Sequence, residues 1–73
     1  MIFISKETLI NEEKIIKVVG QRTKGICIIM EMDYKISTEF GTLTDFFDFL
    51  RFVRTDPTAS FEEYVMAKHS LMV

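Results

Sequence analysis

The sequence is poor in the residues that cross-link a chain, break it or carry it across a membrane. Its 73 residues include one cysteine, one proline, three glycines and no tryptophan. The lone Cys27 excludes an intramolecular disulfide, and no unbroken apolar run approaches the ~20 residues that a membrane-spanning helix needs. No secretory signal pattern opens the chain. We therefore expect a soluble cytoplasmic protein with no membrane partner.

Composition favours one small globular unit. Apolar residues make up 48% of the chain, which is enough for a packed core and argues against disorder. The length leaves room for one domain, residues 1–73. The net charge of −2 is too small to indicate a general nucleic-acid binder. Residues 1–30 carry five basic and three acidic groups, whereas residues 31–73 carry four basic and eight acidic groups, so the second half is the negative one.

A period of two runs through residues 26–36. Apolar side chains occupy every second position, and the intervening positions end in three charged residues, Glu31, Asp33 and Lys35. This alternation is typical of a half-buried strand. The side predicted to be buried consists of Ile26, Ile28, Met30, Met32, Tyr34 and Ile36.

Two further strand regions precede this one. Residues 14–19 are rich in β-branched side chains, and Gly20 and Gly25 flank the connection to the next strand. The first ten residues also read as extended chain, and they form either one bent strand or a short strand followed by an irregular link. We expect these regions and residues 26–36 to form a three-stranded antiparallel meander.

The period then changes to that of a helix. Thr42 and Asp45 have the spacing of a capping box, and Gly41 lets the chain turn out of the strand. This helix should run to about Arg54 and must end near Pro57.

A second capping box, Ser60 with Glu63, predicts a final helix from Phe61 towards Leu71. The predicted fold is α+β: a three-stranded antiparallel meander followed by two α-helices packed on one face, in the order β-β-β-α-α.

Four of the seven phenylalanines fall between residues 42 and 53. On a helical wheel, Phe52 lies on the polar side between Asp45 and Asp48. Two explanations remain open for it: the second helix covers its ring, or the ring is an anchor for a partner or a second copy. The predicted core arc consists of Leu43, Phe46, Phe47, Phe49, Leu50 and Val53, opposite Thr44, Asp45, Asp48 and Arg51.

No pattern of reactive residues indicates catalysis. His69 has no orienting acid or nucleophile that the sequence identifies, and Cys27 has no second thiol. The carboxylates lack the spacing of a calcium loop, and the three glycines form no phosphate-binding motif. We expect no enzymatic activity, no cofactor and no metal.

The leading functional interpretation is a small regulatory or inhibitory protein that binds another protein, possibly as a homodimer. Its candidate contact residues are Phe49 and Phe52 with the adjacent charges Asp48 and Arg51. The alternative is a nucleic-acid-binding module that uses the basic hairpin of residues 17–24, with phosphate contacts from Lys17, Arg22 and Lys24.

Overall fold

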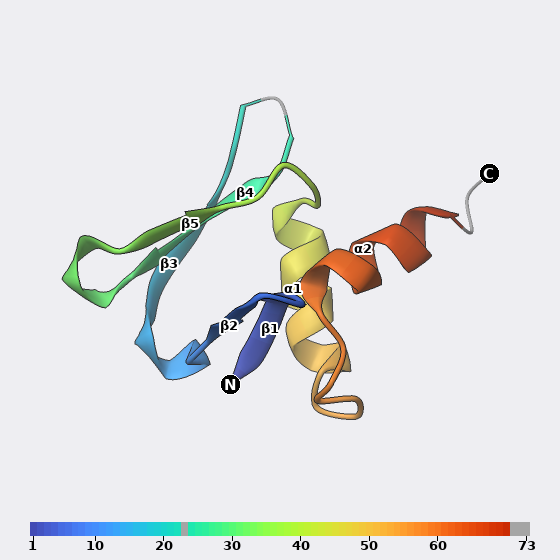
Figure 1. Cartoon of the computed structure of the whole chain (residues 1–73). Coiled ribbons are helices and arrows are strands. Elements are labelled where there is room, and N and C mark those ends of the chain that lie inside the picture. Colours follow the sequence, from blue (N-terminus) through green and yellow to red (C-terminus); the bar gives the residue numbers. More distant parts are fainter. Residues whose placement is uncertain (23, 71–73) are drawn as a thin grey trace.

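A hairpin, a three-stranded sheet and two helices make up the computed structural model, which describes residues 1–22 and 24–70. Figure 1 shows the sheet on one side of the two helices, with the hairpin between them in the lower part of the view. The elements, in chain order, are β1 (Ile2–Ser5), β2 (Thr8–Ile10), β3 (Ile15–Gly20), β4 (Ile26–Met30), β5 (Lys35–Ser37), α1 (Leu43–Phe52) and α2 (Phe61–Ser70).

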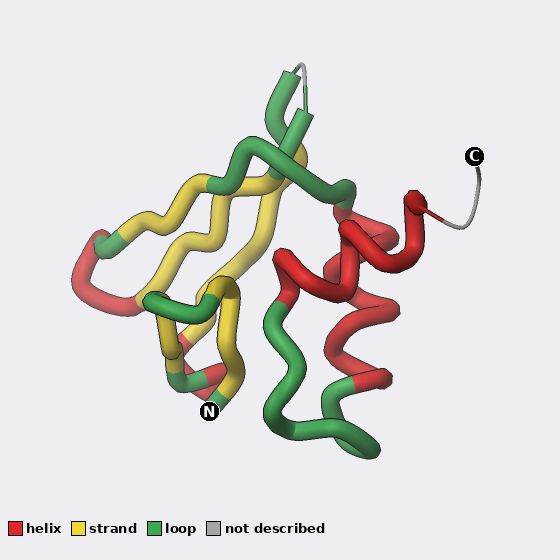
Figure 2. Tube along the Cα trace, turned by 45° about the vertical axis from the view of Figure 1, so that its right-hand side comes forward, coloured by secondary structure: helices red, strands yellow, loops and turns green. Residues whose placement is uncertain are grey.

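The predicted fold class is confirmed. Strands β3, β4 and β5 form an antiparallel meander in that order, and two helices that pack against strands follow it. Figure 2 shows the strands gathered on one side of the molecule and the helices on the other. Both helices begin where the sequence predicted, because Thr42 caps α1 and Ser60 accepts a hydrogen bond from the Glu63 amide at the start of α2. Helix α1 ends at Phe52, slightly before the predicted end near Arg54, and the predicted end of α2 at Leu71 lies outside the described residues.

The extended conformation predicted for the first ten residues is confirmed, but both predicted arrangements of them are wrong. They form neither one bent strand nor a strand with an irregular link, but two strands that pair antiparallel with each other as a separate hairpin. The turn lies at Lys6 and Glu7. The hairpin does not join the meander edge to edge. A single parallel bridge between Phe3 and Ser60 instead connects it to the start of α2.

The predicted long strand of residues 26–36 is also wrong in one respect. The chain reverses at a short 3₁₀ turn, Glu31–Asp33, so this region supplies both β4 and β5. Met32 and Asp33 adopt positive φ angles of 63° and 61°, which L residues rarely accept. Met32 is consequently 97% exposed, and Tyr34 is exposed as well, although both were predicted to be buried.

Two neighbouring glycines, whose backbones share a hydrogen bond, allow tight approaches where the chain enters β4 and α1. Gly25 has a φ of 89°, and a Cβ there would lie 1.9 Å from the Thr38 carbonyl oxygen. Gly41 has a φ of 81°, and a Cβ there would lie 2.6 Å from Cζ of Phe61. Only glycine combines this backbone angle with this lack of space. The entry to β4 and the entry to α1 both depend on that property.

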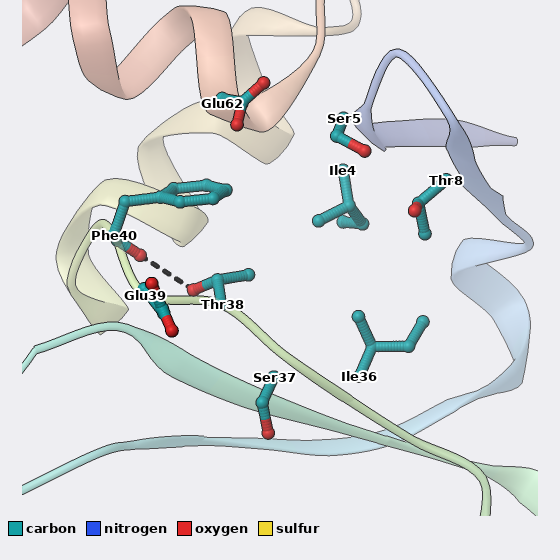
Figure 3. A pocket seen from close by; sticks show the side chains of 9 residues that line it. All are labelled: Ile4, Ser5, Thr8, Ile36, Ser37, Thr38, Glu39, Phe40 and Glu62. Carbon is teal, nitrogen blue, oxygen red and sulfur yellow. Dashed lines mark hydrogen bonds between the residues drawn. The ribbon is translucent and has the colours of Figure 1, made fainter.

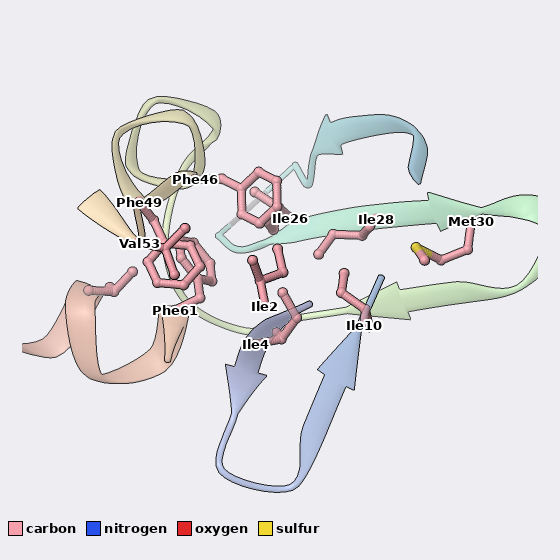
Figure 4. Close-up of a cluster of buried hydrophobic side chains, with 11 residues drawn as sticks. Ile2, Ile4, Ile10, Ile26, Ile28, Met30, Phe46, Phe49, Val53 and Phe61 are labelled. Carbon is pink, nitrogen blue, oxygen red and sulfur yellow. The ribbon is translucent and has the colours of Figure 1, made fainter. Parts of the chain in front are cut away.

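One hydrophobic core joins all the layers. Figure 4 shows isoleucines of the hairpin facing the inner side of β4, with the phenylalanines of both helices at one end. The predicted inner positions Ile26, Ile28 and Met30 are buried, so the alternation set the register of β4 correctly. The remaining buried members are Ile2, Ile4, Ile10, Phe46, Phe49, Val53, Phe61 and Val65.

The buried side of α1 is rotated relative to the predicted arc. Phe47, predicted to be core, is 51% exposed, while Asp45, predicted to face solvent, is buried. Both differences have one cause: α2 packs against the flank of α1 that carries Asp45, and nothing in the described chain covers the flank that carries Phe47 to the same extent. The sequence left open whether α2 covers the flank of α1 that carries Asp45 and Phe52, so the predicted core arc did not include that flank.

Replacing Ile28 by alanine tests the core. Ile28 is fully buried at the centre of β4, so Ile28→Ala should lower the free energy of unfolding by about 2–5 kcal/mol. Urea titration followed by circular dichroism measures this loss. Met32→Ala is the matched control, because the Met32 side chain is exposed, and it should change the free energy by less than about 0.5 kcal/mol. Equal effects of the two substitutions would contradict the burial pattern of β4 and the turn after it.

Candidate interaction surfaces

Asp45 is the buried polar centre that links the two helices. Its backbone amide donates to Oγ1 of Thr42 (3.1 Å) and its Oδ2 accepts from the Thr42 amide (3.0 Å), so the predicted capping box of α1 is complete. Nζ of Lys68 donates to Oδ1 of Asp45 at 2.8 Å, and Nε2 of His69 lies 3.3 Å from Oδ2. The Lys68 ammonium also donates to Oδ2 of Asp48 at 3.2 Å. The last turn of α2 is thereby fastened to the first turn of α1.

The electrostatics of this cluster favour the charged forms of Asp45 and Lys68. Burial alone would raise the pKa of the Asp45 carboxyl, but the hydrogen bonds from Lys68, His69 and the Thr42 amide outweigh it and hold that pKa below its ordinary value. The hydrogen bond to Asp45, reinforced by Asp48, raises the pKa of the Lys68 ammonium. Each charge also suits its helix end, because the N-terminal turn favours an anion and the C-terminal turn a cation.

The sequence did not reveal an acid beside His69, and the structure supplies one in Asp45. These residues lie 24 positions apart, so only the packing of α2 on α1 brings them together. Within residues 1–22 and 24–70, no hydroxyl or thiol is hydrogen-bonded to the His69 ring. Cys27 lies partly buried in β4, as a free thiol. The contacts of His69 therefore help to join the last turn of α2 to the first turn of α1.

An aromatic groove runs between α1 and α2. The Phe52 ring packs on Tyr64 with centroids 5.2 Å apart and ring planes inclined by 39°, yet 40% of Phe52 remains exposed. The second helix thus covers Phe52 in part, as one of the two explanations predicted, and contact of its exposed surface with a partner stays a prediction. The groove has a volume of about 360 Å³ and is lined by Phe52, Asp56, Ala59, Glu63, Tyr64, Ala67 and Lys68.

The other predicted contact residues on α1 fall into different environments. Phe49 has no exposed surface and packs against Phe61 and Tyr64, so it belongs to the core and is not accessible to a partner in this fold. Asp48 is half-buried and bound by Lys68. The Arg51 side chain is exposed, with one long contact of 4.0 Å to Asp48. Phe52 is the predicted contact residue that combines an apolar ring with access to solvent.

The basic residues of the alternative interpretation are all exposed. Arg22 and Lys24 lie in the loop after β3, while Lys17 lies within the strand on the side away from the helices. Lys17 pairs with Ile29, which pairs in turn with Lys35, so the two lysines flank Ile29 in one row across the sheet. The structure therefore adds Lys35 to the predicted basic set.

A more polar groove lies between the hairpin, β5 and the start of α2. Figure 3 shows Ile4 and Ile36 within this groove and Glu62 above it. Its volume is about 410 Å³. Oγ1 of Thr38 donates to the Phe40 carbonyl (2.7 Å) and accepts from the Ile26 amide (3.0 Å), so this hydroxyl holds the wall in place.

No protein-family model matches the chain, and no curated protein or solved structure shows significant similarity to it. Among the described residues, no three histidine, cysteine or carboxylate side chains lie close enough to hold a metal ion. No helix between Leu43 and Ser70 is long and apolar enough to cross a membrane. The functional proposal therefore depends on the geometry of the surface.

The buried carboxylate predicts a specific acid response. The pKa of Asp45 is lower in the folded than in the unfolded chain, so its contribution to stability is present above the unfolded value of about 3.9 and is lost as pH falls through the folded value. Asp45→Asn should cost about 1–3 kcal/mol near neutral pH and should lose less stability than the native chain on acidification. Urea titrations at a series of pH values measure both effects.

Asp48→Asn is the control, because this half-buried residue contacts the same Lys68. It should cost less than about 1 kcal/mol and keep the acid response of the native chain. Parallel pH profiles for the native chain and Asp45→Asn would contradict the role assigned to Asp45.

Proposed function

We propose that this protein is a small, non-enzymatic regulatory or inhibitory domain of the cytoplasm that binds another protein through the aromatic groove between α1 and α2. The observation that carries the proposal is the ring of Phe52, which stays 40% exposed although Tyr64 packs against it. Fully burying a phenylalanine contributes roughly 1.5–3 kcal/mol, so a partner that covers the remaining surface gains part of that energy.

The form of the groove supports recognition of a side chain from another protein. Ala59 and Ala67 leave space beside the two aromatic rings, and a groove of about 360 Å³ is large enough for an apolar side chain. Partly covered aromatics at the centre of a depression are frequent binding hot spots. Tyr64 packs on Phe52 and Phe49 and so forms the groove in the absence of a partner, and a preformed groove lowers the entropic cost of binding.

The charges at the rim indicate the chemistry of the partner. Asp56 and Glu63 line the groove, and neither forms an ion pair within the described part of the chain. The cation at the rim, Lys68, is already bound by Asp45 and Asp48. The free charge around the groove is therefore negative, and the best partner presents an apolar anchor beside lysine or arginine.

Nucleic-acid binding is the second candidate, and one observation favours it. Lys17 and Lys35 flank Ile29 on the uncovered side of the sheet, and Arg22 and Lys24 extend the basic surface at the loop. Such a surface would hold phosphates electrostatically, so its affinity would fall steeply with salt. Aromatic side chains for base stacking are not part of this row, which is why protein binding ranks first.

Phe52→Ser tests the proposed groove. The substitution should lower the free energy of unfolding by less than about 1.5 kcal/mol, because the ring is only partly covered. Capture of protein from lysate of the native host should fall at least about tenfold, because a hot-spot ring is lost. Quantitative pull-down with immobilised native and variant chains measures the change.

Tyr34→Ser is the matched control, since Tyr34 is an exposed aromatic residue that lies outside the aromatic groove and away from the β3 edge. It should leave capture unchanged. Capture that survives Phe52→Ser, or binding of DNA and RNA at moderate salt that Lys17→Glu abolishes, would overturn the protein-binding proposal in favour of the second candidate.

A further inference from the structure

Strand β3 forms an open edge of the sheet. It pairs with β4 on one side, and within the described residues no strand pairs with its other side. The Gln21 amide donates to the Gly25 carbonyl, and backbone bonding alternates along an antiparallel pair. The register therefore directs the backbone groups of Val19 and Lys17 towards β4 and those of Val18 and Gly20 towards solvent. An open edge of this kind is a template for another strand.

An apolar groove lies beside this edge, between β3 and α1. Its volume is about 420 Å³, and Ile16 and Phe47 stand at its border with exposed fractions of 62% and 51%. The floor is formed by Phe46, whose ring lies 6.3 Å from that of Phe47, and by Leu50. A strand added to β3 would therefore set its inward side chains against apolar surface that this chain leaves exposed.

The charges at the two ends of β3 are opposite. Glu12 and Glu13 precede the strand, and with Lys14 this end carries a net charge of −1. Arg22 and Lys24 follow the strand, and both are exposed. An antiparallel neighbour of the same sequence brings each acidic end beside a basic end, whereas a parallel one opposes like charges. The distribution of charge along β3 is thus complementary to that of an antiparallel β3 from a second copy.

We propose that a second copy of this chain docks on this edge, with β3 pairing antiparallel to β3 of the second copy about a two-fold axis at Val18. The two three-stranded sheets then form one continuous sheet. Ile16 and Phe47 of both copies close the shared groove, and the surface used is separate from the aromatic groove of Phe52.

The register follows from the backbone and from the only charged side chain within β3. With the axis at Val18, the outward amide of each Val18 donates to the outward carbonyl of Val18 in the other copy, and Lys17 lies opposite Val19. An axis at Lys17 would place two ammonium groups opposite each other, which is destabilising. The Val18 register also keeps the helix-covered sides of both sheets on the same side, where the two apolar grooves meet.

Ile16→Lys tests the interface without removing a buried side chain of the monomer. Sedimentation equilibrium over a range of concentrations should show a dimer for the native chain. The variant should have a dissociation constant raised at least about a hundredfold, because each dimer would enclose two unpaired ammonium groups. Met66→Lys, an equivalent substitution at an exposed residue of α2, is the control and should dimerise as the native chain does.

Charge reversal tests the antiparallel arrangement. The double variant R22E/K24E should dimerise at least about tenfold more weakly, because each acidic end then meets another acidic end. Combining it with E12K/E13K restores opposite charges at each end and should recover the native dissociation constant. Failure of this rescue would overturn the antiparallel pairing.

The remaining outcomes also decide the matter. A native chain that stays monomeric at every concentration, or a dimer that tolerates Ile16→Lys, would overturn the β3 interface. A dimer that Phe52→Ser abolishes but Ile16→Lys does not would place self-association at the aromatic groove instead. Loss of partner capture in Phe52→Ser with dimerisation intact leaves both proposals standing, so the two can fail separately.

Discussion

The packing of Phe61 is the constraint on which the rest of the structure depends. This fully buried ring is the first residue of α2, and its centroid lies 5.3 to 5.5 Å from those of Phe46, Phe49 and Phe40. It therefore joins both helices to the loop that leaves the sheet. The approach is so close that residue 41 must be glycine. Because interiors are packed to the density of crystals, one ring in this position fixes the angle at which α2 crosses α1.

That crossing brings oppositely charged helix ends together. The first turn of α1 meets the last turn of α2, so Asp45 can accept hydrogen bonds from Lys68 while it also caps its own helix. A buried carboxylate without these donors would be costly, whereas one with them is held in its charged form. The same crossing sets Tyr64 against Phe52. The contacts of Asp45 with Lys68 and His69, and the aromatic groove, thus both follow from one arrangement of the two helices.

Local features of the fold were predictable from the sequence, and those set by distant contacts were not. Alternation placed Ile26 and Ile28 correctly because a strand's register follows from its own pattern, and both helix starts followed from caps a few residues long. The reversal at Met32 escaped prediction because no glycine or asparagine marks it, and the positive φ angles are borne by Met32 and Asp33. Cross-strand pairing of β4 with β5 stabilises this turn, and such pairing is not visible in a single strand's period. The acid beside His69 was not predicted because Asp45 and His69 lie in different helices and meet only where α2 packs on α1.

The rotation of α1 explains why the protein has two separate apolar surfaces. Five positions separate Phe47 from Phe52, which places them roughly 140° apart around the helix. The wider arc between them faces the core and carries Phe46, Phe49 and Val53, all buried. Helix α2 covers one flank incompletely and the sheet edge β3 leaves the other flank open, so one phenylalanine emerges on each side. A single two-turn segment thereby contributes one side to the core and leaves a partly exposed phenylalanine on each flank. The proposed partner site and the proposed β3 interface therefore use different flanks of the same helix.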